Sequence, residues 1–329
     1  MKRFKNILLY LHGEHENDAS LERAAALASE NNAALKVVEV QEYSTSHATS
    51  GGGEMAWDRH FLERTEYLDR AIAPIRDQGI SVSAQVLLGT PFVEVIRLVQ
   101  RFGYDLVMTT AEGQGGLREA LFGTTTTKLL RKCPCPVWVI KATHGKQYRC
   151  VLAAVTPCPG EETEKAALNH KIIELAYSLA KLENSELHIV QAWLITGELA
   201  MRQRLKPAQI KQIVRDNEVM YRIALSKLVE KYWLELLRHE VHLVNGVAAE
   251  VIPNLAEKKQ VELIVMGTVG RAGIPGLIMG NTAEEVLRRV DCSVLAVKPD
   301  GFVSPLKLDK SQWKENGEVA ARLTPMSGE

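Results

Sequence analysis

The sequence has few cysteines, few aromatic residues, no excess of either charge and no long apolar run. Its five cysteines in 329 residues are too few and too irregularly spaced for a disulfide framework. Forty basic and forty acidic residues cancel, which argues against a nucleic-acid partner. No apolar stretch approaches a membrane span, and the run at 7–11 is too short for a signal sequence. These absences predict a soluble cytoplasmic protein.

What the sequence contains is a repeat. A chain of 329 residues is long enough for two domains of about 140–150 residues each. The segment from Pro91, PFVEVIRLVQRFGYDLVMTTAEGQGG, matches the segment from Ala248, AAEVIPNLAEKKQVELIVMGTVGRAG. Each reads as a helix, an apolar strand and a glycine-bearing loop, and a helix and a further strand follow in both. Cys135 and Cys292 occupy the same place before that last strand. The chain therefore holds two copies of one unit.

Strands alternate with helices in both copies, which predicts parallel pairing with helices on both faces of each sheet. The upstream strands are expected at 5–11, 34–40 and 81–88 in copy one, and at 149–155, 186–192 and 240–244 in copy two. Long amphipathic helices are expected at 57–76 and 207–237. The fold class is thus α/β with two tandem five-stranded parallel sheets. We place the first domain at 1–143, the second at 148–300 and a polar tail at 301–329.

The loop after the fourth strand of copy two is the candidate binding site. In open α/β sheets, ligands sit beyond the carboxyl ends of the strands, where helix N-termini offer free N–H groups. Here Gly267 and Gly270 are followed, after nine residues, by Gly280, Asn281 and Thr282 at a helix start. Glycines allow close approach of phosphate oxygens, and the small polar residues add donors.

This spacing, attached to the fourth strand of a duplicated five-strand unit, resembles the nucleotide loop of the universal stress protein family. The resemblance covers about residues 4–300 and implies a strand order of 3-2-1-4-5, an adenine nucleotide alpha hydrolase-like fold and a stress-response role. It also implies ATP or a related nucleotide as the ligand of some members. The site that it implies in copy two comprises Thr156, Ala192, Met266, Gly267, Gly270, Gly280, Asn281 and Thr282.

Both copies depart from the family pattern. The aspartate that ends the first strand in nucleotide-binding members is replaced by Thr156 in copy two and by His12 in copy one, where Val40 matches Ala192. In the copy-one loop, Thr110 replaces the first glycine and Glu112 adds a negative charge. We therefore expect a nucleotide or another phosphate-containing ligand in copy two, with copy one as a degenerate partner.

Other interpretations stay open. The loop glycines could serve turns and helix packing alone, and the protein could be a scaffold that binds no nucleotide and recognises a macromolecule that the sequence does not name. No nucleophile, base and acid come together, so no enzyme is predicted beyond slow ATP hydrolysis. The resemblance implies that the last strands, 136–141 and 293–298, pair within the chain, because domains of this family commonly dimerise through their last strands. Both strands are also apolar edge candidates, which favours such pairing. The resemblance leaves a homodimer open as well.

Cysteines and histidines give no predicted metal or redox site. Cys133 and Cys135 read as small core residues. His239 and His242 are three apart on an expected strand, and so point to opposite faces. His12 and His15 lie on a polar loop that is more typical of a solvated surface than of a metal site. The segment 44–53, STSHATSGGG, has the composition of a flexible loop and lies where a lid over the binding edge would lie.

Overall fold

The computed structural model describes residues 3–12, 18–42, 53–111, 123–141, 147–158, 164–195, 197–232, 239–269 and 279–307. Several features named above lie outside these residues. They are His15, the expected lid except its last residue, Glu112, Gly270, most of the segment that joins the two copies, and the tail from 308 onward.

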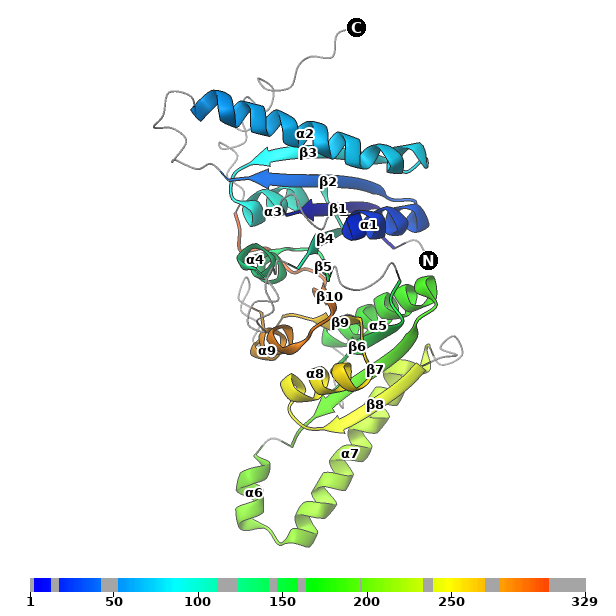
Figure 1. Ribbon diagram of the computed structural model, residues 1–329. Coiled ribbons are helices and arrows are strands. Elements are labelled where there is room, and N and C mark those ends of the chain that lie inside the picture. Colours follow the sequence, from blue (N-terminus) through cyan, green and yellow to red (C-terminus); the bar gives the residue numbers. More distant parts are fainter. Residues whose placement is uncertain are drawn as a thin grey trace.

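In the described part of the chain, ten strands form one continuous sheet with the order β3-β2-β1-β4-β5-β10-β9-β6-β7-β8 (Figure 1). The strands of copy one are β1 (Asn6–Leu11), β2 (Ala34–Gln41), β3 (Val82–Leu88), β4 (Leu106–Thr110) and β5 (Val137–Ile140). Those of copy two are β6 (Cys150–Ala154), β7 (Glu186–Trp193), β8 (His239–Asn245), β9 (Leu263–Gly267) and β10 (Ser293–Val297).

Each half of the sheet has the predicted order 3-2-1-4-5, and every pair within a half is parallel. The apolar sequences of the strands explain this parallel pairing. Strands β4, β5, β6 and β10 are buried along their whole length, as parallel strands covered on both faces should be. The outermost strands, β3 and β8, are half-buried or exposed at most positions. The α/β fold class predicted from the sequence is confirmed.

The two halves join through their last strands. β5 and β10 pair antiparallel, with Val139 opposite Val294 and Trp138 opposite Leu295. This confirms the predicted pairing within the chain and explains it, because each strand covers the apolar edge of the other. The strand order of copy two runs in reverse from this central antiparallel pair. The two copies are therefore related by an approximate twofold axis that passes between β5 and β10.

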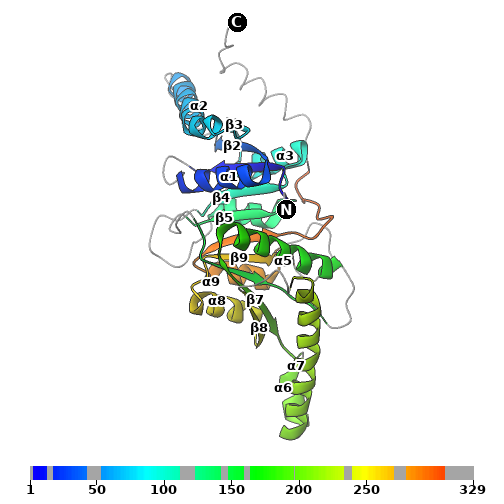
Figure 2. The same cartoon turned by 90° about the vertical axis from the view of Figure 1, so that its right-hand side faces the viewer.

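Helices flank the strands on both sides (Figure 2). One core layer contains apolar residues of α1 (Asp18–Asn31), α2 (Gly53–Asp77), α5 (Glu164–Glu183) and α7 (Pro207–Glu230). The other contains residues of α3 (Pro91–Phe102), α4 (Thr124–Lys132), α8 (Ala248–Lys258) and α9 (Asn281–Arg289). Both layers run through the two halves without a break, so the copies share their cores. None of the described helices is long and apolar enough to cross a membrane.

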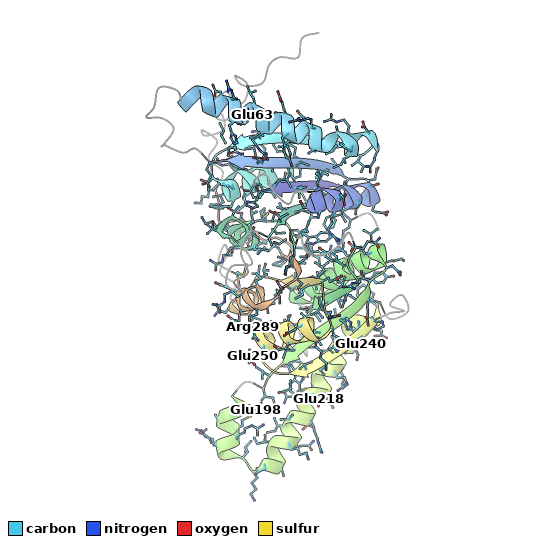
Figure 3. All side chains as sticks on the ribbon, in the orientation of Figure 1. Glu63, Glu198, Glu218, Glu240, Glu250 and Arg289 are labelled. Atoms are coloured by element: carbon cyan, nitrogen blue, oxygen red, sulfur yellow. The ribbon has the colours of Figure 1, made fainter. Side chains whose placement is uncertain are left out.

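Copy two differs from the expectation around its long helix. α7 ends at Glu230, whereas the periodicity predicts a helix to 237. The next two residues form a turn, in which the Tyr232 N–H is donated to the Val229 carbonyl at 2.8 Å and the buried Tyr232 hydroxyl lies 3.1 Å from Glu174. Residues 233–237 of the expected helix lie outside the described residues. A short helix that the sequence did not reveal, α6 (Glu198–Arg204), packs beside α7. Glu198 and Glu218 mark this projecting pair in Figure 3.

Candidate functional site

The residues of the copy-two loop converge at the carboxyl end of β9. Gly267 ends the strand, opposite Val297 of β10. Thr268 follows it, and its carbonyl accepts the N–H of Gly280 at 2.9 Å. A bridge between Val269 and Met279 closes the loop just above. The structure thus brings Gly267 and Gly280 together, although twelve residues separate them in the sequence, while Gly270 lies outside the described residues.

The helix that starts at this point presents an open N-terminus. Gly280 is the N-cap of α9, with φ −64° and ψ 144°, and among the described residues no side chain caps the helix. Asn281 and Thr282 are exposed. First-turn N–H groups have no partner within a helix, and the helix dipole favours an anion there. Glu284 in the same turn opposes an anion, but its carboxylate is 2.7 Å from the Arg131 guanidinium, which offsets the charge.

Gly267 also has a packing role. A Cβ atom built on it would lie 3.1 Å from Cδ2 of Leu168, on α5, and 3.7 Å from Cδ1 of Ile172. The missing side chain therefore lets α5 approach β9 closely. This contact accounts for the glycine without a ligand. It supports the interpretation that the loop glycines serve turns and helix packing.

The remaining predicted residues lie along the same edge of the sheet. Thr156 is exposed two residues past β6, and its N–H is donated to Oδ1 of the buried Asn169 at 2.9 Å. Ala192 is half-buried in β7 opposite Val244, and Met266 is buried in β9 opposite Ala154. No carboxylate stands at position 156, so an adenosine at this edge would find a single short hydroxyl there.

Copy one is built differently at the equivalent place. Thr110 ends β4 as a buried residue where copy two has Gly267. Gly123 caps α4 as Gly280 caps α9, also without a side-chain cap. At the end of β1, Nδ1 of His12 is 3.2 Å from the Tyr10 hydroxyl, and Val40 is buried in β2. The helix N-terminus is therefore present in both copies, whereas the small first loop residue is present in copy two alone.

The structure adds one residue to this edge that the sequence did not single out. Lys298 follows β10 and is 2% exposed, with Nζ 2.7 Å from Oγ1 of Thr268 and 2.5 Å from the Leu130 carbonyl of α4. Burial lowers its pKa to about 8, although the thiols of Cys133 and Cys135 act in the opposite direction. The repeat could have pointed to this residue, because a lysine directly follows the last strand in both copies, Lys141 in copy one and Lys298 in copy two.

The prediction that Cys133 and Cys135 are core residues is confirmed, and the histidine prediction was incomplete. Cys133 and Cys135 are buried, and all five cysteines are free thiols. His239 and His242 point to opposite faces of β8, as expected. His242, however, meets His188 of the neighbouring strand, at 3.0 Å between ring nitrogens. That contact depends on the register between β7 and β8, and residue spacing within one strand carries no information on register.

Comparison with known proteins gives the same family for both halves. A model of the universal stress protein family matches residues 3–141 and 148–298. Universal stress protein E of Escherichia coli K12 is 29% identical over 320 residues, which is 95% of this chain and 99% of that protein. A universal stress protein E homolog of Haemophilus influenzae is 27% identical over 311 residues, or 90% of this chain and 98% of the homolog.

Solved structures share the fold over most of the chain. A functionally unknown protein from Pseudomonas aeruginosa PAO1 superposes with a TM-score of 0.70, at 24% identity and with 98% of each chain covered. A universal stress protein from Archaeoglobus fulgidus gives a TM-score of 0.62, at 19% identity, with 89% of this chain and 98% of that chain covered.

Proposed function

Since the chain belongs to the universal stress protein family, we propose that it acts in the stress response as a cytoplasmic binding protein. Its ligand is a nucleotide such as ATP, or another phosphate-containing molecule, held at the carboxyl edge of copy two. The site consists of Gly267, Gly270, Gly280, Asn281 and Thr282 around the phosphates. Thr156, Ala192 and Met266 line the other end. Copy one completes the fold and the shared cores.

The observation that carries this proposal is that Gly280, at the start of α9, lies beside the end of β9. Its N–H bond to the Thr268 carbonyl places the uncapped start of α9 directly beside the strand end. An anion at this point would meet backbone N–H groups and the positive end of the helix dipole together. The exposed Asn281 amide and Thr282 hydroxyl supply further donors.

Titration of ATP by calorimetry tests the assignment to copy two. Gly280→Asp is expected to weaken ATP binding at least about tenfold, because a carboxylate would stand at the helix start where phosphate oxygens bind. Gly280 has φ −64° and ψ 144°, which aspartate adopts readily as an N-cap, so the helix itself should remain intact. Thermal unfolding of the variant checks this.

Gly123→Asp is the matched control. It places the same carboxylate at the start of α4, where the backbone is also free of a side-chain cap. ATP affinity should not change in this variant. Loss of binding in Gly123→Asp, with Gly280→Asp unaffected, would assign the ligand to copy one.

A second prediction concerns the choice of base. Losing a charged hydrogen-bond partner costs about 1.5–3 kcal/mol, and Thr156 stands where the family aspartate would bind the nucleoside. ATP and GTP should therefore bind with similar, phosphate-driven affinity. Thr156→Asp should tighten ATP about tenfold, an estimate on the same hydrogen-bond scale. Cys158→Asp, on the same loop, controls for added charge. Tight wild-type binding of ATP well ahead of GTP would contradict this prediction.

The alternative is a scaffold protein that binds no nucleotide. The packing of Leu168 against Gly267 favours it, because this contact explains the first glycine without a ligand. Mass spectrometry of small molecules released from the purified protein separates the two functions. A phosphate-containing ligand in stoichiometric amount supports the first, whereas its absence together with no response to ATP by calorimetry supports the second.

A further inference from the structure

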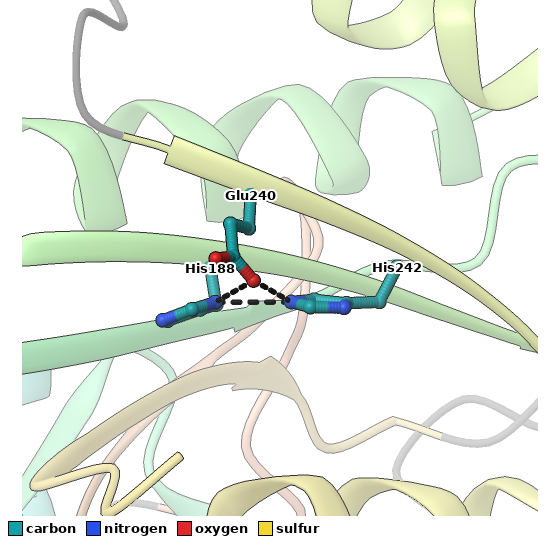
Figure 4. A group of neighbouring side chains, drawn as sticks. All are labelled: His188, Glu240 and His242. Atoms are coloured by element: carbon teal, nitrogen blue, oxygen red, sulfur yellow. Dashed lines mark hydrogen bonds and ion pairs between the residues drawn. The ribbon is translucent and has the colours of Figure 1, made fainter.

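Two histidines and a glutamate meet on the outer strands of copy two, away from the proposed nucleotide edge. His188 lies on β7 directly opposite Glu240 on β8, and His242 is two residues further along β8. Residues two apart on a strand share a face, so the three side chains converge (Figure 4). Within the described part of the chain, this is the group of histidine, cysteine and acidic side chains that could hold a metal ion.

The distances between the three ligand atoms suit a small transition-metal ion. Nδ1 of His188 is 3.0 Å from Nε2 of His242, and Oε2 of Glu240 is 3.7 Å and 3.6 Å from those two nitrogens. A tetrahedral zinc ion with bonds of about 2.0–2.1 Å separates its ligand atoms by about 3.3 Å. The observed separations lie on both sides of that value, so small side-chain movements would complete the geometry.

The surroundings of His188 favour the required tautomer. Its side chain is 1% exposed, and Nε2 lies 3.4 Å from Oε1 of Glu186. A proton on Nε2, held towards that carboxylate, leaves Nδ1 as a lone pair facing His242 and Glu240. Metal-binding histidines characteristically donate their second ring N–H to a carboxylate in this way. Glu186 is thus placed as a positioning residue.

We propose that His188, Glu240 and His242 form a binding site for a divalent transition-metal ion of the zinc type. Two imidazoles and one carboxylate would hold the ion, and the fourth position would face solvent, since the side chains of Glu240 and His242 are 49% and 18% exposed. The ion would join the outermost strand β8 to β7. Edge strands are otherwise held on one side only.

Lys259 competes with the metal for this carboxylate. Its ammonium is 2.6 Å from Oε2 of Glu240, the same oxygen that faces the histidines. A metal ion would have to displace the ammonium and would be repelled by its charge. Removing Lys259 should therefore strengthen metal binding, whereas a purely structural cluster would gain nothing from its removal.

The experiment is competition of the tag-free full-length protein with a chromophoric chelator for zinc, together with visible absorption spectra after cobalt addition. Wild type should bind one zinc ion at this site, with a cobalt spectrum typical of a four-coordinate centre. Glu240→Gln and His242→Gln should weaken this binding at least about tenfold, and Glu186→Gln by about tenfold through its effect on His188. Lys259→Met should tighten it about two- to fivefold, the range expected for an exposed ion pair.

His239→Gln is the matched control, because this histidine is on β8 but faces the other side of the sheet. It should bind zinc as wild type does. Unchanged zinc affinity in His242→Gln would overturn the proposal, as would a Lys259→Met protein with no zinc bound at this site. The gain expected for Lys259→Met is decisive, since a damaged fold cannot produce tighter binding.

Discussion

Replacing Arg23 by methionine is expected to lower the free energy of unfolding by about 3–5 kcal/mol at neutral pH, because it leaves a buried carboxylate without its partner. Arg23 lies on α1 of copy one and is 2.5 Å from Glu183 at the end of α5 in copy two, with 6% and 10% of the two side chains exposed. The guanidinium also lies 3.8 Å from the centroid of the Tyr148 ring. Urea denaturation measures the loss.

Two further variants separate the ion pair from general packing. Replacing both partners, Arg23→Met with Glu183→Gln, should recover much of the stability, because no buried charge then remains. Arg222→Met is the control: its pair with Glu218 on α7 is 62% and 43% exposed, so the change should stay within about 0.5 kcal/mol. Equal losses from Arg23→Met and Arg222→Met would show that the buried pair has no special weight.

The loss caused by Arg23→Met should also depend on pH. Burial raises the pKa of Glu183, against the opposing effect of Arg23 and of the Tyr148 N–H. Without Arg23 the folded-state pKa rises further above the unfolded value. The folded variant then binds more protons than the unfolded chain between these two values, so its stability falls as pH rises through that window. The difference from wild type should therefore be largest at neutral pH and should narrow in acid.

The α/β class and the parallel pairing could be predicted from the sequence because they follow from short-range patterns, namely apolar runs that alternate with amphipathic helices. The duplication gave the same answer twice, down to the matching places of Cys135 and Cys292. The strand order 3-2-1-4-5 was instead implied by the resemblance to the universal stress protein family. The pairing of β5 with β10 was expected from the same resemblance and from the apolar character of both strands.

The contacts between individual side chains distant in sequence could not be predicted. His188 and Glu240 are opposite one another only because β7 and β8 have one particular register, and alternation alone does not fix register between neighbouring strands. Arg23 and Glu183 meet only once the two copies are joined. α6 is short, and the contact of Tyr232 with Glu174, just past the end of α7, is tertiary. No local periodicity encodes either feature.

The candidate site, too, could be predicted from the sequence only in part. The convergence of Gly267 and Gly280 follows from the strand and the helix that the sequence predicts. The packing of Leu168 against Gly267 does not follow from it, although this contact offers a second reason for the glycine. A glycine pattern alone thus could not separate a ligand role from a packing role.

Lys298→Met is expected to change the pH dependence of stability more than stability at neutral pH. At neutral pH two effects oppose each other: the variant removes a buried ammonium, but it also removes the donor to the Leu130 carbonyl and to Thr268. Above neutral pH the effect of burying the ammonium can be measured separately, because it changes with pH. Burial lowers the pKa of Lys298 from 10.5 to about 8, so between these values the unfolded chain binds the proton and the folded chain does not.

Stability from this residue therefore rises with pH across that window, by about 3 kcal/mol at most for a shift of this size. The free energy of unfolding of wild type minus that of Lys298→Met should grow by that amount between about pH 7.5 and 10.5, the interval that contains both the folded-state and the unfolded-state pKa of Lys298. Other buried groups act in the opposite direction, since burial raises the pKa of Cys150, Cys292 and Tyr148 to about 12. They are common to both proteins and cancel in the difference.

The matched control is Lys141→Met, which removes the equivalent lysine of copy one, whose ammonium pairs with Asp291. It reports the general effect of losing a cation where the copies join. Urea denaturation at closely spaced pH values gives the three curves. A Lys298→Met curve that runs parallel to wild type would mean that the ammonium is solvated in the folded state. A diverging curve would place a desolvated lysine directly beneath Thr268, and hence beneath the proposed phosphate loop, where its charge would add to the attraction for an anion below pH 8.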